Sequence, residues 1–140
     1  MYTAYWWQPK KLASIGGASA WMVGAAYEDF VAVDTYAAVP LALSARPKFM
    51  GWYNPMLTQG VPMLITEYGQ YVVKPGTVPS ATSQAQRAKA IAGDAAGISS
   101  QDKIKMWLHW GGTGAQGDWS LTDAASQKAW RNIAATSRTS

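Results

Sequence analysis

Titratable and aromatic side chains stand together at the ends of three apolar runs of this sequence. Each run ends in one residue of each kind, namely Asp34 and Tyr36, Glu67 and Tyr68, and His109 and Trp110. A carboxylate is costly to bury without a partner, so Glu67 needs a specific role at the end of an otherwise apolar run. That role is either structural, as a salt bridge or a backbone cap, or catalytic.

The other polar and aromatic residues also have structural and functional interpretations. Asp34 could accept hydrogen bonds from loop amides, and a lone histidine such as His109 is more often packed or solvated than catalytic. Trp52 and Trp130 fall in predicted helices and are expected in the core. The tryptophans at predicted strand ends or in loops could instead stack on sugar rings, and these are Trp6, Trp7, Trp110 and Trp119.

The elements that must position these residues can be read from the apolar pattern. Residues 30–36, 62–68 and 104–110 are short runs, and the first two are nearly continuous in apolar residues until their last positions. This pattern predicts parallel strands that are covered on both faces, with residues 2–7 as a fourth strand. One helix is predicted over residues 47–58, with an interruption at Asn54-Pro55. A second helix is predicted over residues 83–96 and ends at Gly97. A third helix is predicted after a cap at Asp123.

Strands that alternate with helices favour an α/β fold with a parallel sheet. Ligands of such sheets and barrels bind at the carboxyl ends of the strands, where the polar residues stand. Because side chains alternate along a strand, Asp34 and Tyr36 should share one face, and Met63, Ile65 and Glu67 should share another.

Composition excludes several classes of protein. The 140 residues are 49% hydrophobic and 14% charged, contain no cysteine and carry a net charge of +4. A disordered chain, a disulfide scaffold and a cysteine-ligated metal site are therefore excluded. No apolar run approaches a membrane span, and the scattered basic residues form no nucleic-acid-binding face. Eight tryptophans and seven tyrosines against two phenylalanines suit a wet cleft that binds flat ligands.

Residues 62–69, Pro-Met-Leu-Ile-Thr-Glu-Tyr-Gly, resemble the nucleophile strand of clan A glycoside hydrolases. Residues 21–36 resemble the passage into the sixth strand of glycoside hydrolase family 26, the mannanase-type family. Residues 5–9, Tyr-Trp-Trp-Gln-Pro, resemble the end of the preceding strand. Residues 118–123, which run into Ala129-Trp130-Arg131, are similar to the closing loop and final helix of bacterial members.

This resemblance implies that residues 1–135 are the second half, strands five to eight, of a (β/α)8 barrel, followed by a tail over residues 136–140. It implies Glu67 as the nucleophile and Tyr36 within reach of Glu67 or the substrate, with no metal and no cofactor. The implied substrate-binding residues are Trp110 as the floor beneath the sugar, Asp34 beside Tyr36, Trp6 or Trp7 as a further platform, and His109.

The sequence departs from the family in one respect, because the acid/base glutamate of strand four has no counterpart here. The only other glutamate, Glu28, precedes the predicted second strand and so falls at the wrong end of the barrel. We therefore expect a retaining hydrolase of β-linked polysaccharides such as mannan or glucan that is weak or inactive alone. Its expected partners are a polysaccharide or oligosaccharide, with a second copy or a missing N-terminal half to complete the barrel, and neither nucleic acid nor a membrane.

Two alternatives remain open at this point. The chain could be a non-catalytic carbohydrate-binding or structural module derived from such a barrel, for instance in a phage tail or a cell-surface assembly. It could also be a truncated reading frame without an independent role. The expected location is extracellular or virion-associated if the parent protein carries a secretion signal or belongs to a tail.

Overall fold

The secondary structure follows the predicted alternation of strands and helices. The computed structural model describes residues 2–4, 16–37, 41–70, 81–99, 104–114 and 117–136. The elements in chain order are β1 (Tyr2–Ala4), η1 (Ala18–Trp21), β2 (Val31–Ala37), η2 (Leu43–Ala45), α2 (Pro47–Met56), β3 (Met63–Gln70), α3 (Ala81–Ser99), β4 (Ile104–His109), β5 (Thr113–Gly114), β6 (Gly117–Asp118) and α4 (Ala124–Thr136).

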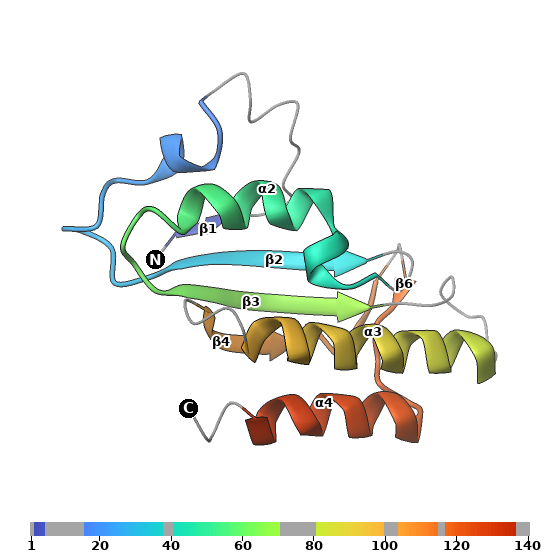
Figure 1. Ribbon diagram of the computed structural model, residues 1–140. Coiled ribbons are helices and arrows are strands. Elements are labelled where there is room, and N and C mark those ends of the chain that lie inside the picture. Colours follow the sequence, from blue (N-terminus) through green and yellow to red (C-terminus); the bar gives the residue numbers. More distant parts are fainter. Residues whose placement is uncertain are drawn as a thin grey trace.

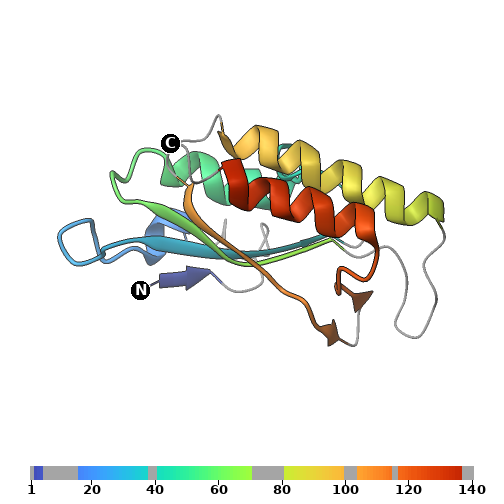
Figure 2. The same cartoon turned by 90° about the horizontal axis from the view of Figure 1, so that it is seen from below.

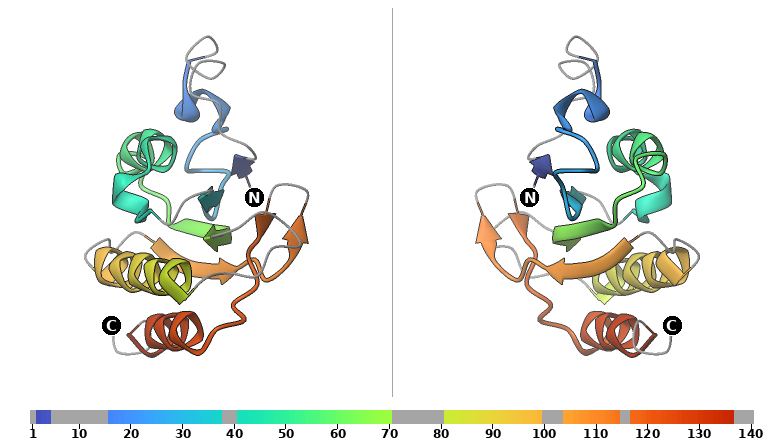
Figure 3. Two further views of the ribbon diagram at one scale, coloured as in Figure 1. Left: turned by 90° about the vertical axis from the view of Figure 1, so that its right-hand side faces the viewer. Right: turned by 90° about the vertical axis from the view of Figure 1, so that its left-hand side faces the viewer.

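Strands β1 to β4 form one parallel sheet in the order β1-β2-β3-β4, which is also their order in the chain (Figure 1). Helices α2, α3 and α4 lie on one side of this sheet, and the antiparallel β5–β6 hairpin lies on the other side (Figure 3). Helices α3 and α4 run side by side in the same direction (Figure 2). The predicted α/β fold of parallel β/α units is therefore confirmed, while its place in a complete barrel stays a prediction.

A bulge in β3 changes which residues share a face. Val33 of β2 is opposite Ile65, but the next residue, Asp34, is opposite Glu67, so Thr66 is one extra residue in β3. An extra residue reverses the alternation of side chains beyond it. Met63 and Ile65 pack in the core beneath the helices, whereas Glu67 lies on the opposite face with Asp34. The prediction that Met63, Ile65 and Glu67 share one face is wrong for this reason.

The sheet thus has two distinct faces. The face beneath the helices, called here the helix face, carries Val31, Val33, Thr35, Met63, Ile65, Tyr68, Gln70, Trp107 and His109. The other face, called here the Glu67 face, carries Ala32, Asp34, Tyr36, Leu64, Glu67, Gly69, Met106 and Leu108. The core lies on the helix face, where the buried side chains of α2 and α3, Phe49, Trp52, Met56 and Ile91, meet the strands.

The helix boundaries differ from the predicted ones at two places. Helix α2 continues through Pro55, because a proline in the last turn removes only one hydrogen bond. Helix α3 extends from Ala81 to Ser99 and passes through Gly97, since glycine lowers helix propensity without forcing an end. The predicted cap of α4 is confirmed, as Asp123 Oδ1 accepts the backbone N–H of Ser126 at 2.8 Å. None of the described helices is long and apolar enough to cross a bilayer.

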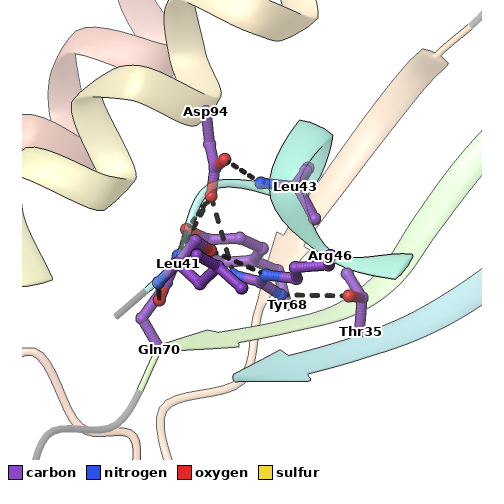
Figure 4. Close-up of polar contacts among 7 residues, drawn as sticks. All are labelled: Thr35, Leu41, Leu43, Arg46, Tyr68, Gln70 and Asp94. Atoms are coloured by element: carbon purple, nitrogen blue, oxygen red, sulfur yellow. Dashed lines mark hydrogen bonds and ion pairs between the residues drawn. The ribbon is translucent and has the colours of Figure 1, made fainter. Parts of the chain in front are cut away.

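A buried polar cluster ties α3 to the sheet and to the segment that follows β2 (Figure 4). Asp94 of α3 accepts hydrogen bonds from Tyr68 Oη at 2.6 Å, from Gln70 Nε2 at 3.1 Å and from the backbone N–H of Leu43. Arg46 lies 3.7 Å from the same carboxylate and donates to Thr35 Oγ1 at 3.0 Å.

Burial raises the pKa of Asp94, and the hydrogen bonds from Tyr68 and Leu43 oppose that rise. Burial also lowers the pKa of Arg46, which the nearby Asp94 partly offsets. The two side chains therefore depend on each other to remain charged in the core.

We predict that Asp94→Ala lowers the free energy of unfolding by about 3–5 kcal/mol, because it leaves the Arg46 guanidinium buried without its counter-ion. Denaturant titration measures this loss. Asp29→Ala, at an exposed aspartate, is the matched control and should change stability by less than about 0.5 kcal/mol. A loss of under about 1 kcal/mol in Asp94→Ala would show that the cluster contributes little to stability.

Candidate active site

The bulge brings Glu67 beside Tyr36 at the carboxyl ends of β2 and β3. The Tyr36 hydroxyl donates a hydrogen bond to Glu67 Oε2, and both residues are partly exposed. Among the described residues, Glu67 is thus paired with a phenol and not with a cation or a backbone amide.

Asp34 stands next to Glu67 in the sheet register. Its Oδ1 accepts the Thr66 hydroxyl at 2.8 Å, so the extra residue of the bulge also orients this carboxylate. Burial raises the pKa of Asp34, the Thr66 hydrogen bond opposes the rise, and the charge of Glu67 adds to it. The loop-amide contact considered for Asp34 from the sequence is replaced here by a contact between neighbouring strands.

Trp119, which directly follows β6, packs against the ring of Tyr36. Its ring lies 5.2 Å from that of Tyr36 at an angle of 56°, and the residue is 8% exposed. Gly69 of β3 lies directly beneath both rings. A Cβ at Gly69 would be 2.5 Å from Trp119 Cδ1 and 2.7 Å from Tyr36 Cδ1, so only glycine fits this position without displacing them.

Trp110 follows β4 directly, and its backbone N–H donates to Tyr68 O at 2.8 Å, which extends the strand pairing by one residue. Alternation along the strand sets its side chain on the face opposite His109, which is the Glu67 face. The residue is 42% exposed, and its ring lies against Gly112, where a Cβ would be 3.0 Å from the indole. An exposed indole at a strand end has the shape and polarity to stack on a sugar ring.

His109 lies on the helix face, away from Glu67. Its ring centroid is 5.1 Å from that of Trp130 and 6.4 Å from that of Tyr68. Burial, with a smaller effect of the Arg87 charge, lowers its pKa to about 4. The structure therefore does not bring His109 together with the other predicted site residues.

The other predicted residues fall at the far end of the sheet or outside the description. Glu28 is buried before the start of β2, where Oε1 accepts the backbone N–H of Val23 at 3.4 Å, so it lies at the amino end of the sheet as predicted. Trp6 and Trp7 lie outside the described residues. Within the described ranges, no group of three metal-ligating side chains comes together.

Sequence reasoning identified Tyr36, Asp34 and Glu67 but not the residues that bring them together. Thr66 gave no signal, because a bulge depends on the register between two strands. Trp119 was only one of several tryptophans that could stack on a ligand. Gly69 belonged to the quoted motif, and the closeness of two rings explains why a glycine stands there.

The fold and the site together define an α/β protein of parallel β/α units with a carboxylate and tyrosine site at the carboxyl ends of its strands. Similar solved chains are GH128 (subgroup I) endo-beta-1,3-glucanases from Amycolatopsis mediterranei. The chain in the complex with laminaripentaose has 18% sequence identity to this chain and a TM-score of 0.49. The chain in the complex with laminaritriose and laminaribiose has 20% identity and a TM-score of 0.49. The chain in the complex with laminaritriose has 19% identity and a TM-score of 0.48.

Each match covers 75% of this chain and 45% of the glucanase, so the chain spans less than half the length of those enzymes. At this identity and TM-score we draw no functional conclusion from the likeness. No family model matches the sequence, and no curated protein is found as a relative. The resemblance to family 26 therefore stays a prediction.

The low pKa of His109 predicts a specific loss of stability in acid. The unfolded chain takes up this proton near pH 6.5 and the folded chain only near pH 4, so stability falls as the pH drops through that window and the loss is complete below it. Because the side chain is partly exposed, we expect the loss to be about 1–2 kcal/mol.

His109→Phe should reduce the stability difference between pH 7 and pH 4 by this amount in denaturant titrations. His109 is the only histidine of the sequence, so its ring-proton NMR signal can be followed directly and should titrate near pH 4. A midpoint near the ordinary value of about 6.5 would contradict the buried, neutral ring.

Proposed function

We propose that this chain is the nucleophile-bearing half of a retaining glycoside hydrolase that acts on β-linked polysaccharides, with Glu67 as the nucleophile. The observation that carries the proposal is the hydrogen bond from Tyr36 to Glu67 Oε2 at the carboxyl ends of two parallel strands. Glu67 is partly exposed and is held at Oε2 by a phenol, so its other oxygen is directed to react, as a nucleophile requires.

In the first step the free oxygen of Glu67 attacks the anomeric carbon while the glycosidic carbon–oxygen bond breaks. Tyr36 holds Oε2, which leaves Oε1 for the attack. A separate acid protonates the departing oxygen. In the second step that residue takes a proton from water, and the oxygen of the water replaces Glu67 at the anomeric carbon.

The acid/base residue is the part that this half does not supply in the proposal. Glu28 lies before β2, at the other end of the sheet from Glu67. Asp34 is the neighbour of Glu67 in the adjoining strand, so it would act on the charge of the nucleophile rather than on the leaving group. We assign the acid to an N-terminal half of the barrel or to another chain.

Trp110 is the proposed sugar platform, because the residue is 42% exposed and directly follows β4. Trp6 or Trp7, which follow β1 in the sequence, would add a second platform. Asp34 would bind sugar hydroxyls beside Tyr36. His109, which packs on Trp130 on the helix face, is not included in the substrate-binding set.

The outer edge of β4 gives a reason to propose a partner. Met106 and Leu108 of the Glu67 face are 39% and 48% exposed, and no described strand pairs with that edge of β4. Parallel sheets normally bury both faces, so exposed apolar side chains on a face favour a covering partner. An edge strand with unpaired backbone groups also associates readily with other strands. We propose that a second copy or an N-terminal half covers it and completes the barrel.

A carbohydrate-binding or structural module is the second candidate function. The exposed ring of Trp110 favours it, since stacking on a sugar does not require Glu67. The two candidates differ in which variant destroys glycan binding and whether Glu67 reacts covalently.

We predict that Glu67 reacts with a dinitrophenyl β-glycoside that carries fluorine beside the anomeric carbon. Its leaving group departs without protonation, so the missing acid is not needed, and the fluorine slows hydrolysis of the ester formed on Glu67. Peptide mass spectrometry should find the glycosyl group on Glu67, with gluco and manno reagents tested in parallel. Glu67→Gln should slow labelling by about a thousandfold or more.

Glu28→Gln is the matched control, because it changes the only other glutamate and should label like the wild-type chain. Labelling of Glu67→Gln, or of a different residue, would contradict the assignment. No labelling, together with glycan affinity that Trp110→Ala destroys and Glu67→Ala preserves, would favour the binding module.

The exposed edge predicts that the chain associates with itself when its other half is absent. Light scattering should give an apparent mass of at least twice 15.1 kDa, and Leu108→Lys should lower it by adding a charge to the edge strand. Lys105→Arg keeps the charge at an exposed position of β4 and should have no effect. A monodisperse monomer would contradict association through this edge.

A further inference from the structure

We propose that Trp119 is a positioning residue that holds the Tyr36 ring so that its hydroxyl stays on the Glu67 carboxylate. The catalytic meaning of this inference rests on the proposed function, but the contacts and their test do not require any reaction. Trp119 itself touches neither the nucleophile nor the reacting atoms in this proposal, and it acts through Tyr36.

The ring contact itself supports this role. Trp119 and Tyr36 lie 5.2 Å apart at 56°, a tilted arrangement that aromatic pairs favour. Tyr36 reaches Glu67 Oε2 with its hydroxyl, while its ring is bounded by Trp119. Because the Trp119 residue is 8% exposed, it is a fixed surface rather than a ring free to turn in solvent.

Gly69 of β3 contacts both rings. Because Gly69 has no side chain, the Trp119 and Tyr36 rings can pack directly on the backbone of β3, where a Cβ would lie 2.5 Å from Trp119 and 2.7 Å from Tyr36. Gly69 and Tyr36 are also direct neighbours in the sheet register. The tyrosine ring therefore lies between the tryptophan and a strand backbone, which leaves it little room to swing away from Glu67.

The backbone around Trp119 is anchored to the loop after β4 and to α3. Its N–H donates to Gly112 O at 3.1 Å, and Ser120 Oγ donates to Gly111 O at 3.1 Å. Arg87 of α3, which is 1% exposed, donates from Nη1 to Ser120 O at 3.1 Å and pairs with Asp123 at 2.6 Å. These contacts hold the backbone from which the Trp119 side chain extends.

The test follows the hydrogen bond between Tyr36 and Glu67 without substrate. The sequence has only two glutamates, Glu28 and Glu67, so a chain labelled with carboxyl-¹³C glutamate gives two signals, and Glu67→Gln assigns them. Tyr36 and Asp34 of β2 are the titratable groups that face Glu67 from the neighbouring strand. The Glu28 signal is an internal control, since that residue lies at the other end of the sheet.

Tyr36→Phe should move the Glu67 carboxyl ¹³C signal, recorded at one fixed pH, because the carboxyl group loses a hydrogen bond. Trp119→Ala should move the signal in the same direction by a smaller amount. The double variant should shift it no further than Tyr36→Phe alone. This non-additivity identifies an effect that passes through Tyr36, which a merely structural role would not produce.

Two milder variants cover the case in which Trp119→Ala does not fold. Trp119→Phe keeps an aromatic ring and should restore most of the wild-type signal position. Gly69→Ala keeps the Trp119 side chain but displaces both rings, and should also move the signal. Trp130→Phe is the matched control, because Trp130 also stacks on a tyrosine, Tyr68, at 5.6 Å but on the helix face, and it should leave the Glu67 signal unchanged.

An unchanged Glu67 carboxyl signal in the folded Trp119 and Gly69 variants would overturn the inference, as would changes that add to that of Tyr36→Phe. Both results are read without substrate, so they are independent of whether the fluoro-glycoside labels Glu67. Labelling with no change in the Glu67 signal keeps the proposed function and rejects the role of Trp119. A non-additive change in the signal without labelling keeps the role of Trp119 and rejects the nucleophile.

Discussion

The single extra residue in β3 is the constraint on which the site depends. Thr66 breaks the register between Val33–Ile65 and Asp34–Glu67, and it turns Glu67 out of the face that carries Met63 and Ile65. With regular alternation the carboxylate would point beneath the helices, where burial would disfavour its charge. Bulges are rare in parallel sheets and common beside functional sites. Here the bulge places a partly exposed carboxyl group near the end of an otherwise buried strand.

The two faces of the sheet carry different kinds of polar group. On the helix face, the charges of Asp94 and Arg46 are buried, partnered and crossed by hydrogen bonds from three elements. On the Glu67 face, the carboxylates are partly exposed and held by hydroxyl groups of Tyr36 and Thr66. Hydroxyls orient a carboxyl group without forming an ion pair with it, and both carboxyl groups remain partly exposed on this face.

Long-range contacts connect the two faces through the end of the chain. Arg87 in α3 is buried beneath the sheet, yet it holds the segment that carries Trp119 on the other side. Residues far apart in the sequence thus act on one tyrosine, with Gly69 supplying the space for both rings. A substitution in the helix layer can therefore reach the site through packing alone, without any change in the residues of the site.

The sequence by itself determined the parallel α/β fold, the Asp123 cap and the placement of Asp34, Tyr36 and Glu67 at strand ends. These features depend on local patterns of apolar residues and turns, which can be read along the chain. Only the tertiary structure decided that Glu67 meets Tyr36, that His109 faces away and that Trp119 packs over Gly69. Each of these depends on the register of one strand against another or on contacts between distant segments, and alternation within one strand contains neither.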